Sequence, residues 1–175
     1  QWKLGWFNVG QEGTMKYQII ISIRSQNLLL VSRQKVHYTY KISSSMAGSG
    51  QLKGSYQTPL GHHIVRAKIG DNAPIFTVFK ARRATGKAWS PKLNDEYPNE
   101  DFILSRILWL SGKEKGLNRL GNFDSMQRFI YIHGTNEENF LGSPASHGCI
   151  RMANQDVISL YNLVDVGTDV FINEE

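Results

Sequence analysis

The sequence has one cysteine, no long hydrophobic run and no internal repeat. A single cysteine cannot form a disulfide within the chain, so Cys149 is either free or paired between chains. The longest apolar runs, such as 28–31, are far shorter than the roughly 18 residues that a membrane-spanning helix requires. We therefore expect neither a disulfide framework nor an integral membrane segment.

The sequence also lacks a run of Lys and Arg and any recognisable nucleic-acid-binding motif, although its net charge is +5. The densest basic cluster consists of Lys80, Arg82, Arg83 and Lys87. A solvated basic face accounts for this pattern, and we predict no nucleic-acid partner. The charge would also suit an anionic lipid surface or an acidic polymer of the cell wall.

The length of 175 residues fits one domain. Residues 1–15 contain three glycines, two tryptophans and no sustained period, so we predict an N-terminal arm over 1–15 and one domain over 16–175. The chain begins at Gln1 without a charged and then apolar leader, so we expect any signal peptide to be missing from it.

Short segments rich in β-branched residues, separated by turn residues, predict seven or eight strands. These segments are 16–23, 28–31, 35–42, 62–69, 74–79, 102–110, 128–132 and 168–172. Within 35–42, the alternation places Val36, Tyr38, Tyr40 and Ile42 on a buried face. The polar insertion over 81–100 is predicted to be a loop of the kind that forms lids or binding sites.

One helix is predicted with Asn154 as its cap, because Val157, Leu160, Tyr161 and Val164 follow at the spacing of a single buried stripe. Many strands and one helix predict a mainly β fold, a β-sandwich or barrel with the helix packed on one side.

The segment HGTNEENFLGSPASHGCIRM, residues 133–152, contains Cys149 together with His133 and His147. An unassisted thiol is roughly 3% ionised at neutral pH, and a nearby imidazole can lower its pKa and make it a nucleophile. His147 lies two residues before the thiol, whereas His133 ends the predicted strand RFIYIH (128–133), and spacing alone does not choose between them. Gly148 permits close approach of backbone amides to a substrate, as an oxyanion hole requires.

Two other interpretations of this segment remain open at this point. Cys149 is a candidate for a small buried hydrophobic residue. Zinc could be bound by Cys149, His147 and His133, but no standard spacing supplies a fourth ligand, so we predict no metal.

The pair of motifs IHGT (132–135) and SHGCIRM (146–152) resembles the active-site motif of the YkuD-type (ErfK/YbiS/YcfS/YnhG) L,D-transpeptidases, bacterial enzymes that remodel peptidoglycan cross-links. A TPLG turn before a strand (58–61) and VGTDVFI (166–172) extend the resemblance to roughly residues 17–173. It implies a YkuD-like β-sandwich or barrel of mixed sheets, with one main helix after the catalytic motif.

The resemblance implies that Cys149 is the nucleophile and His133 the base, with the carbonyl of Gly134 orienting the imidazole. It implies that amides near His147, Gly148 and Cys149 hold the oxyanion, while Ser146 and His147 shape the loop.

Substrate contacts are expected from Arg151, Thr135 and Tyr131. For Arg151 a second role is equally expected, that of tying the loop down.

The implied reaction is acyl transfer. Cys149 attacks the L-centre carbonyl of diaminopimelate in a tetrapeptide stem, D-alanine leaves, and an acceptor amine resolves the thioester. Neither a metal nor an organic cofactor is required. The alternatives are an L,D-carboxypeptidase, in which water is the acceptor, and a catalytically silent cell-wall-binding module. We expect a monomer that acts on peptidoglycan stem peptides in the periplasm or cell envelope.

Overall fold

The computed structural model describes residues 15–175, so the predicted N-terminal arm lies outside the described residues except for its last position. The described part forms ten strands, which are β1 (Gln18–Ser22), β2 (Asn27–Ser32), β3 (Lys35–Ser43), β4 (Gly61–Ile69), β5 (Thr77–Lys80), β6 (Arg83–Ala88), β7 (Ile103–Gly112), β8 (Tyr131–Gly134), β9 (Ile150–Met152) and β10 (Asp169–Asn173). The same residues form helices α1 (Pro91–Glu96) and α2 (Asn154–Leu163) and the short 3-10 helices η1 (Gly121–Phe123) and η2 (Glu138–Phe140).

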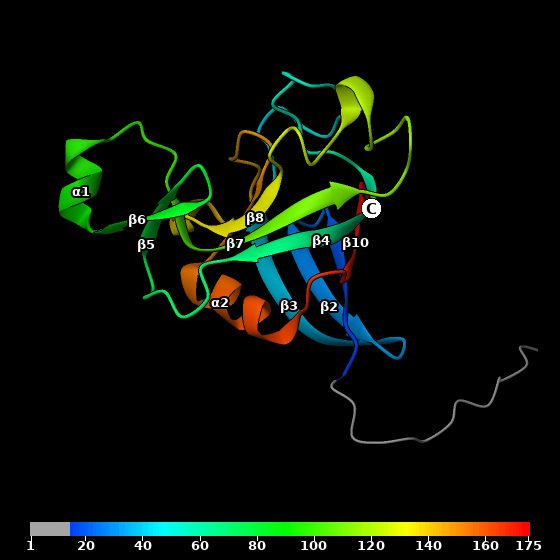
Figure 1. Ribbon diagram of the computed structural model, residues 1–175, viewed down its shortest axis with the longest axis horizontal. Helices are drawn as coiled ribbons and strands as arrows, with labels where there is room; N and C mark the ends of the chain where they lie inside the picture. The colour runs from blue at the N-terminus through cyan, green and yellow to red at the C-terminus, as the bar shows by residue number, and fades with distance from the viewer. Residues whose placement is uncertain (1–14) are drawn as a thin grey trace, which may run out of the picture.

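The strands close into a barrel. Strand β7 pairs with β4 as well as with β8, which closes the ring β4, β10, β1, β2, β3, β9, β8 and β7. The β1–β10 and β8–β9 pairs are parallel and the others are antiparallel, so the sheet is mixed. Strands β5 and β6 and helix α1 extend from the barrel on one side (Figure 1). The predicted mainly β barrel or sandwich is confirmed.

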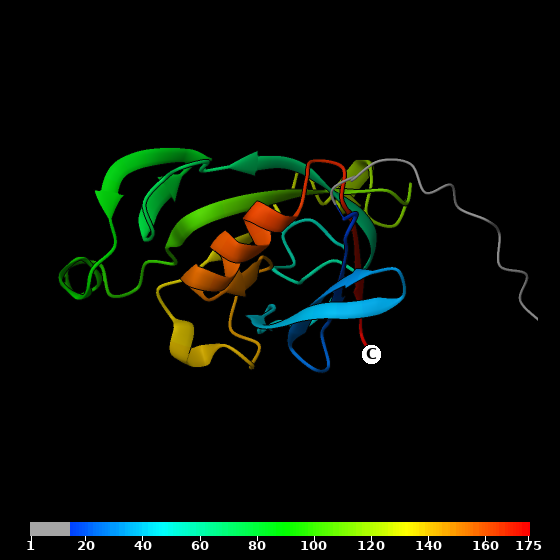
Figure 2. The ribbon, with the colours of Figure 1, turned by 90° about the horizontal axis from the view of Figure 1, so that it is seen from below.

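The core of the barrel follows from the alternation of side chains along each strand. In β1 and β2 every second residue is fully buried, beginning with Ile19 and Leu28. Helix α2 presents the predicted stripe of Val157, Leu160 and Tyr161 to the same core. This main helix follows the SHGCIRM segment (146–152), as predicted, and lies against the barrel (Figure 2).

The predicted buried face of the third strand is wrong in its first half. Val36 is 48% exposed and Tyr38 is 43% exposed, whereas Tyr40 and Ile42 are buried. The reason is that β9 pairs only with the last two residues of β3, so the first half of the strand has β2 as its single neighbour in the sheet.

The insertion over 81–100 is not a loop, because it contains strand β6 and helix α1. Every residue of β6 is exposed, so this strand carries no apolar alternation that would have predicted it. Helix α1 begins after Ser90, whose hydroxyl accepts the Leu93 N–H at 3.3 Å, and Pro91 takes the first helical position.

Two local predictions are also wrong. The cap of α2 is Ala153, while the Asn154 side chain is buried and donates to the carbonyl of Thr135 at 2.8 Å. The TPLG segment forms no turn, because Thr58 bridges to another loop segment and Gly61, with φ +96, already begins β4. Among the described residues, no helix has the length and apolar character needed to cross a membrane.

Candidate active site

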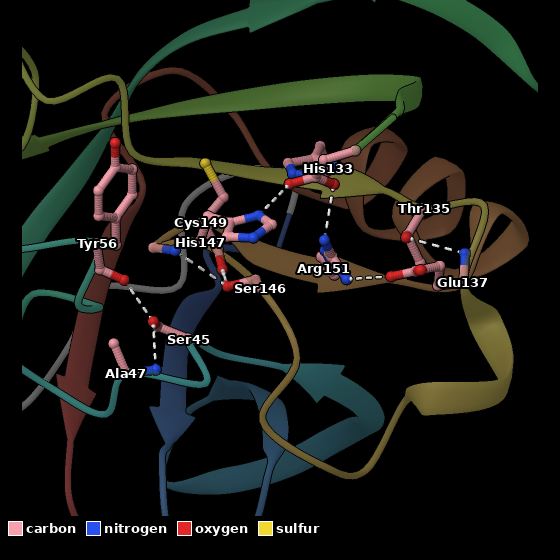
Figure 3. Close-up of polar contacts among 12 residues, drawn as sticks. Ser45, Ala47, Tyr56, His133, Thr135, Glu137, Ser146, His147, Cys149 and Arg151 are labelled. Carbon is pink, nitrogen blue, oxygen red and sulfur yellow. Dashed lines mark hydrogen bonds and ion pairs between the residues drawn. The ribbon is translucent and has the colours of Figure 1, made fainter. Parts of the chain in front are cut away.

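The parallel pair β8–β9 positions the residues of the predicted site. Ile132 pairs with Ile150, and both are fully buried in the barrel core. Because successive side chains on a strand point to opposite faces, His133, Cys149 and Arg151 share the other face. Figure 3 shows these three residues gathered on the two neighbouring strands. Residues that are far apart in the sequence therefore meet through one short ladder of backbone hydrogen bonds.

His133 is buried and neutral. Its Nδ1 lies 2.7 Å from the carbonyl oxygen of Gly134, and since a carbonyl can only accept, Nδ1 carries the proton. Burial lowers the pKa of His133, and the nearby charge of Asp101 and the Gly134 hydrogen bond oppose this shift only in part. The imidazole therefore presents an unprotonated Nε2, which is the form that a general base requires.

Cys149 is a protonated thiol in this arrangement. Its Sγ accepts the Tyr131 N–H at 3.3 Å and donates to the carbonyl of Phe129 at 3.4 Å. The side chain packs against Phe79, Ile107 and Tyr131, and burial raises the pKa of the thiol to about 12. This is the reverse of the lowered pKa expected from a neighbouring imidazole, because burial outweighs the favourable contacts of the sulfur.

The backbone before the thiol is held by hydroxyl groups. The Ser146 hydroxyl donates to the Cys149 carbonyl at 2.6 Å and accepts the Gly148 N–H at 3.2 Å. The Gly148 carbonyl accepts the Thr58 hydroxyl at 2.9 Å. Gly148 has φ +127, a conformation that side-chain-bearing residues rarely adopt. The Gly148 amide is therefore engaged within the loop itself.

His147 and Arg151 both contact Asp101, the residue that follows the insertion. His147 Nδ1 lies 3.0 Å from Asp101 Oδ2, and Arg151 Nη2 lies 2.8 Å from Asp101 Oδ1. Burial acts to raise the pKa of Asp101, but its electrostatic interaction with His133, the His147 hydrogen bond and the Arg151 guanidinium lower it overall. Asp101 is thus an anion that links the end of the insertion to two residues of the SHGCIRM motif.

Within residues 15–175, no group of three His, Cys, Asp or Glu side chains is arranged to hold a metal ion. His133 and Cys149 instead lie on the same face of the sheet, the imidazole hydrogen-bonded to Gly134 and the thiol to Phe129.

A protein-family model described as the L,D-transpeptidase catalytic domain, YkuD, matches residues 16–172. The chain belongs to this family. The resemblance predicted from the two motifs is confirmed.

Two curated relatives agree with this assignment to the L,D-transpeptidase family. A putative L,D-transpeptidase of Bacillus subtilis, YqjB, is 46% identical over 157 residues, which cover 90% of the chain and 71% of that relative. A probable L,D-transpeptidase of Escherichia coli K12, YbiS, is 32% identical over 111 residues, which cover 61% of the chain. The match spans only 35% of the length of YbiS.

Solved structures support the fold. L,D-transpeptidase 3 from Mycobacterium tuberculosis superposes with a TM-score of 0.56 at 16% identity, covering 91% of the chain and 62% of that structure. An L,D-transpeptidase from Xylanimonas cellulosilytica gives a TM-score of 0.54 at 18% identity, covering 95% of the chain and 65% of that structure.

In this family member, the three side chains predicted to contact substrate are all engaged elsewhere. The Arg151 side chain is 2% exposed and pairs with Glu137 at 2.7 Å as well as with the aspartate, which favours the loop-tying role. Thr135 is fully buried, and its hydroxyl accepts the Glu137 N–H at 3.1 Å. The Tyr131 hydroxyl is buried and accepts from Arg82 at 3.0 Å. Contact of these side chains with substrate stays a prediction.

Sequence reasoning missed three residues that support the site, namely Asp101, Thr58 and Asn154. Asn154 packs so tightly on Gly134 that a Cβ there would meet its Oδ1 at 2.5 Å. Thr58 was noted only as part of the TPLG turn and Asn154 only as a helix cap, so neither was given a place in the site. The only indication for Asp101 was that it directly follows the polar insertion.

Proposed function

We propose that the protein is a peptidoglycan-remodelling L,D-transpeptidase in which Cys149 is the nucleophile and His133 the base. Membership of the family supports the reaction class. The observation that carries the residue roles is the neutral His133 imidazole, oriented by the Gly134 carbonyl on the same sheet face as the thiol.

The first half-reaction begins from a neutral thiol and a neutral imidazole. When a tetrapeptide stem enters, the thiol proton moves to Nε2 of His133 as Sγ attacks the L-centre carbonyl carbon of diaminopimelate. The S–C bond forms, and the oxyanion accepts a hydrogen bond from a backbone amide such as that of Cys149. The Gly148 amide is already engaged, because it donates to Ser146. The C–N bond then breaks, and D-alanine leaves with the proton from His133.

The second half-reaction transfers the acyl group. An acceptor amine attacks the thioester while His133 takes its proton, an amide bond forms, the C–S bond breaks, and the thiol regains a proton. A thioester reacts with amines far more readily than an amide does, so the transfer needs no cofactor. If water is the acceptor, the same site acts as an L,D-carboxypeptidase.

The deciding experiment incubates the protein with a purified disaccharide-tetrapeptide and follows D-alanine release by mass spectrometry. Release that is lost in Cys149→Ala and in His133→Ala is expected. Release that survives Cys149→Ala contradicts the mechanism, and an absence of release from the intact protein favours a silent wall-binding module.

The same reaction separates the two acceptors. A cross-linked dimer indicates transpeptidation, and a free tripeptide stem indicates the carboxypeptidase. Because this substrate lies outside the cytoplasm, we propose that the protein acts in the cell envelope, and we expect it to elute as a monomer in size-exclusion chromatography.

A further inference from the structure

A cleft of about 280 Å³ opens beside the thiol. Its lining includes Lys53, Tyr56, Arg128 and Phe129. Phe129 also supplies the carbonyl that accepts the thiol hydrogen bond, and His147, which lies two residues before Cys149, lines the cleft as well, so the cleft and the thiol are neighbours. In Figure 3, Tyr56 and His133 lie on opposite sides of Cys149. The cleft therefore lies where one end of a peptide attacked by the thiol would extend.

The cleft carries positive charge without a counter-charge. Lys53 and Arg128 line it, no acidic side chain does, and within residues 15–175 neither cation forms an ion pair. The carboxylate that contacts the lining residue His147 is Asp101, and Asp101 is already paired with Arg151. An anion is the complementary ligand for such a cleft.

Arg128 is held rigidly but is not neutralised. Its guanidinium donates to the carbonyls of Gly50, Gln51 and Gln57 at 3.3, 3.2 and 2.6 Å. These neutral acceptors use its N–H groups and leave its charge in place. Lys53 is exposed, and its backbone N–H is anchored to the Asn122 carbonyl at 2.7 Å. Lys53 is thus the residue that can bind a ligand directly.

The aromatic walls of the cleft are presented at a conformational cost. Tyr56 has φ 58 and Phe129 has φ 56, values that are unfavourable for bulky side chains. Both side chains are nonetheless largely open to solvent, at 66% and 50% exposed. Burial of apolar surface does not account for these conformations, and strain of this kind gathers at binding sites.

We propose that this cleft is a carboxylate subsite, in which Lys53 binds the C-terminal carboxylate of the donor peptide between Tyr56 and Phe129. The inference rests on the proposed function. In that reaction the terminal carboxylate belongs to the leaving residue, separated from the attacked carbonyl only by the scissile nitrogen and one carbon. The cleft beside the thiol is within reach of that group. Arg128 adds a fixed positive charge behind it.

The test measures binding by calorimetry in the Cys149→Ala background, which prevents turnover. The probes are a tetrapeptide stem ending in D-alanine and the same peptide ending in D-alaninamide. The free acid should bind about 10-fold more tightly, as expected for one charge-assisted hydrogen bond in a partly open site. Lys53→Met should remove this preference, and Lys35→Met, at an exposed lysine that begins β3, should retain it. Equal melting temperatures verify the fold of both variants.

Equal binding of the two peptides, an undiminished preference in Lys53→Met, or no binding of either peptide overturns the subsite. The proposed function fails separately. A preference for the free acid without D-alanine release by the intact protein supports the subsite and refutes the transpeptidase. D-alanine release without a preference for the free acid supports the transpeptidase and refutes the subsite.

Discussion

Cys149 should react slowly with small electrophiles while no substrate is bound. Burial raises the pKa of the thiol to about 12 from an ordinary 9.0, which lowers the thiolate fraction at pH 7.5 by about 1000-fold. The side chain is only partly buried, so we expect alkylation at least about 100-fold slower than that of an open cysteine. The His133→Ala variant should alkylate at nearly the same slow rate, because a neutral imidazole does not stabilise the thiolate.

The assay follows iodoacetamide labelling by intact-protein mass spectrometry from pH 6 to pH 10. Ser143→Cys in the Cys149→Ala background provides an exposed thiol in the same fold as the reference. The rate at Cys149 should rise steadily over this range without levelling off. The reasoning would be refuted if Cys149 were labelled as fast as the reference, with a rate that levels off below pH 8 and falls in His133→Ala. That result would indicate a thiolate–imidazolium pair in the resting protein.

Three further outcomes concern the support of the site and the stability of the barrel. Gly134→Ala should lower the free energy of unfolding by about 2 kcal/mol, because the new Cβ would lie 2.6 Å from a backbone carbonyl oxygen. Gly142→Ala has open space around its Cβ and should cost only about 1 kcal/mol, from its positive φ of +97. Equal losses for the two variants in urea unfolding would contradict this. Burial lowers the pKa of His63 to about 4, so the stability that the neutral imidazole contributes above pH 6.5 should be lost as the pH falls toward 4, by about 3 kcal/mol. His63→Gln should flatten this dependence of unfolding free energy on pH in urea titrations. An unchanged dependence in the variant would show that His63 is not its source. Asp101→Asn removes a charge that raises the pKa of His133, so the acid limb of kcat/KM for D-alanine release should move to lower pH, and a move to higher pH would be the opposite of what the structure implies.

Most strands were predictable because their evidence is local, in alternation and turn residues. The spacing within 133–152 brought forward Cys149 with two histidines, and only the resemblance to a known family singled out His133 as the proposed base. The exposed strand β6 escaped prediction because alternation reports a buried face, and β6 has none.

The state of the thiol could not be read from the sequence. Its pKa is raised mainly by burial, and the hydrophobic cluster that covers it includes Phe79 and Ile107 of strands β5 and β7, far from the motif. The ion pair between Arg151 and Asp101 has the same origin, since the two residues lie 50 positions apart in the sequence and only the fold brings them together.

The pairing of β1 with β10 has a consequence for synthesis of the protein. Strand β10 lies between β1 and β4, so the barrel cannot close until residues 169–173 have left the ribosome. Until then the backbone edges of β1 and β4 lack the strand that pairs with both. The contacts that complete the barrel join β1 to β10, two segments that are far apart in the sequence. A nascent chain stalled before Asp169 should therefore be open to proteases and chaperones along both strand edges, whereas release of five further residues lets the whole domain close.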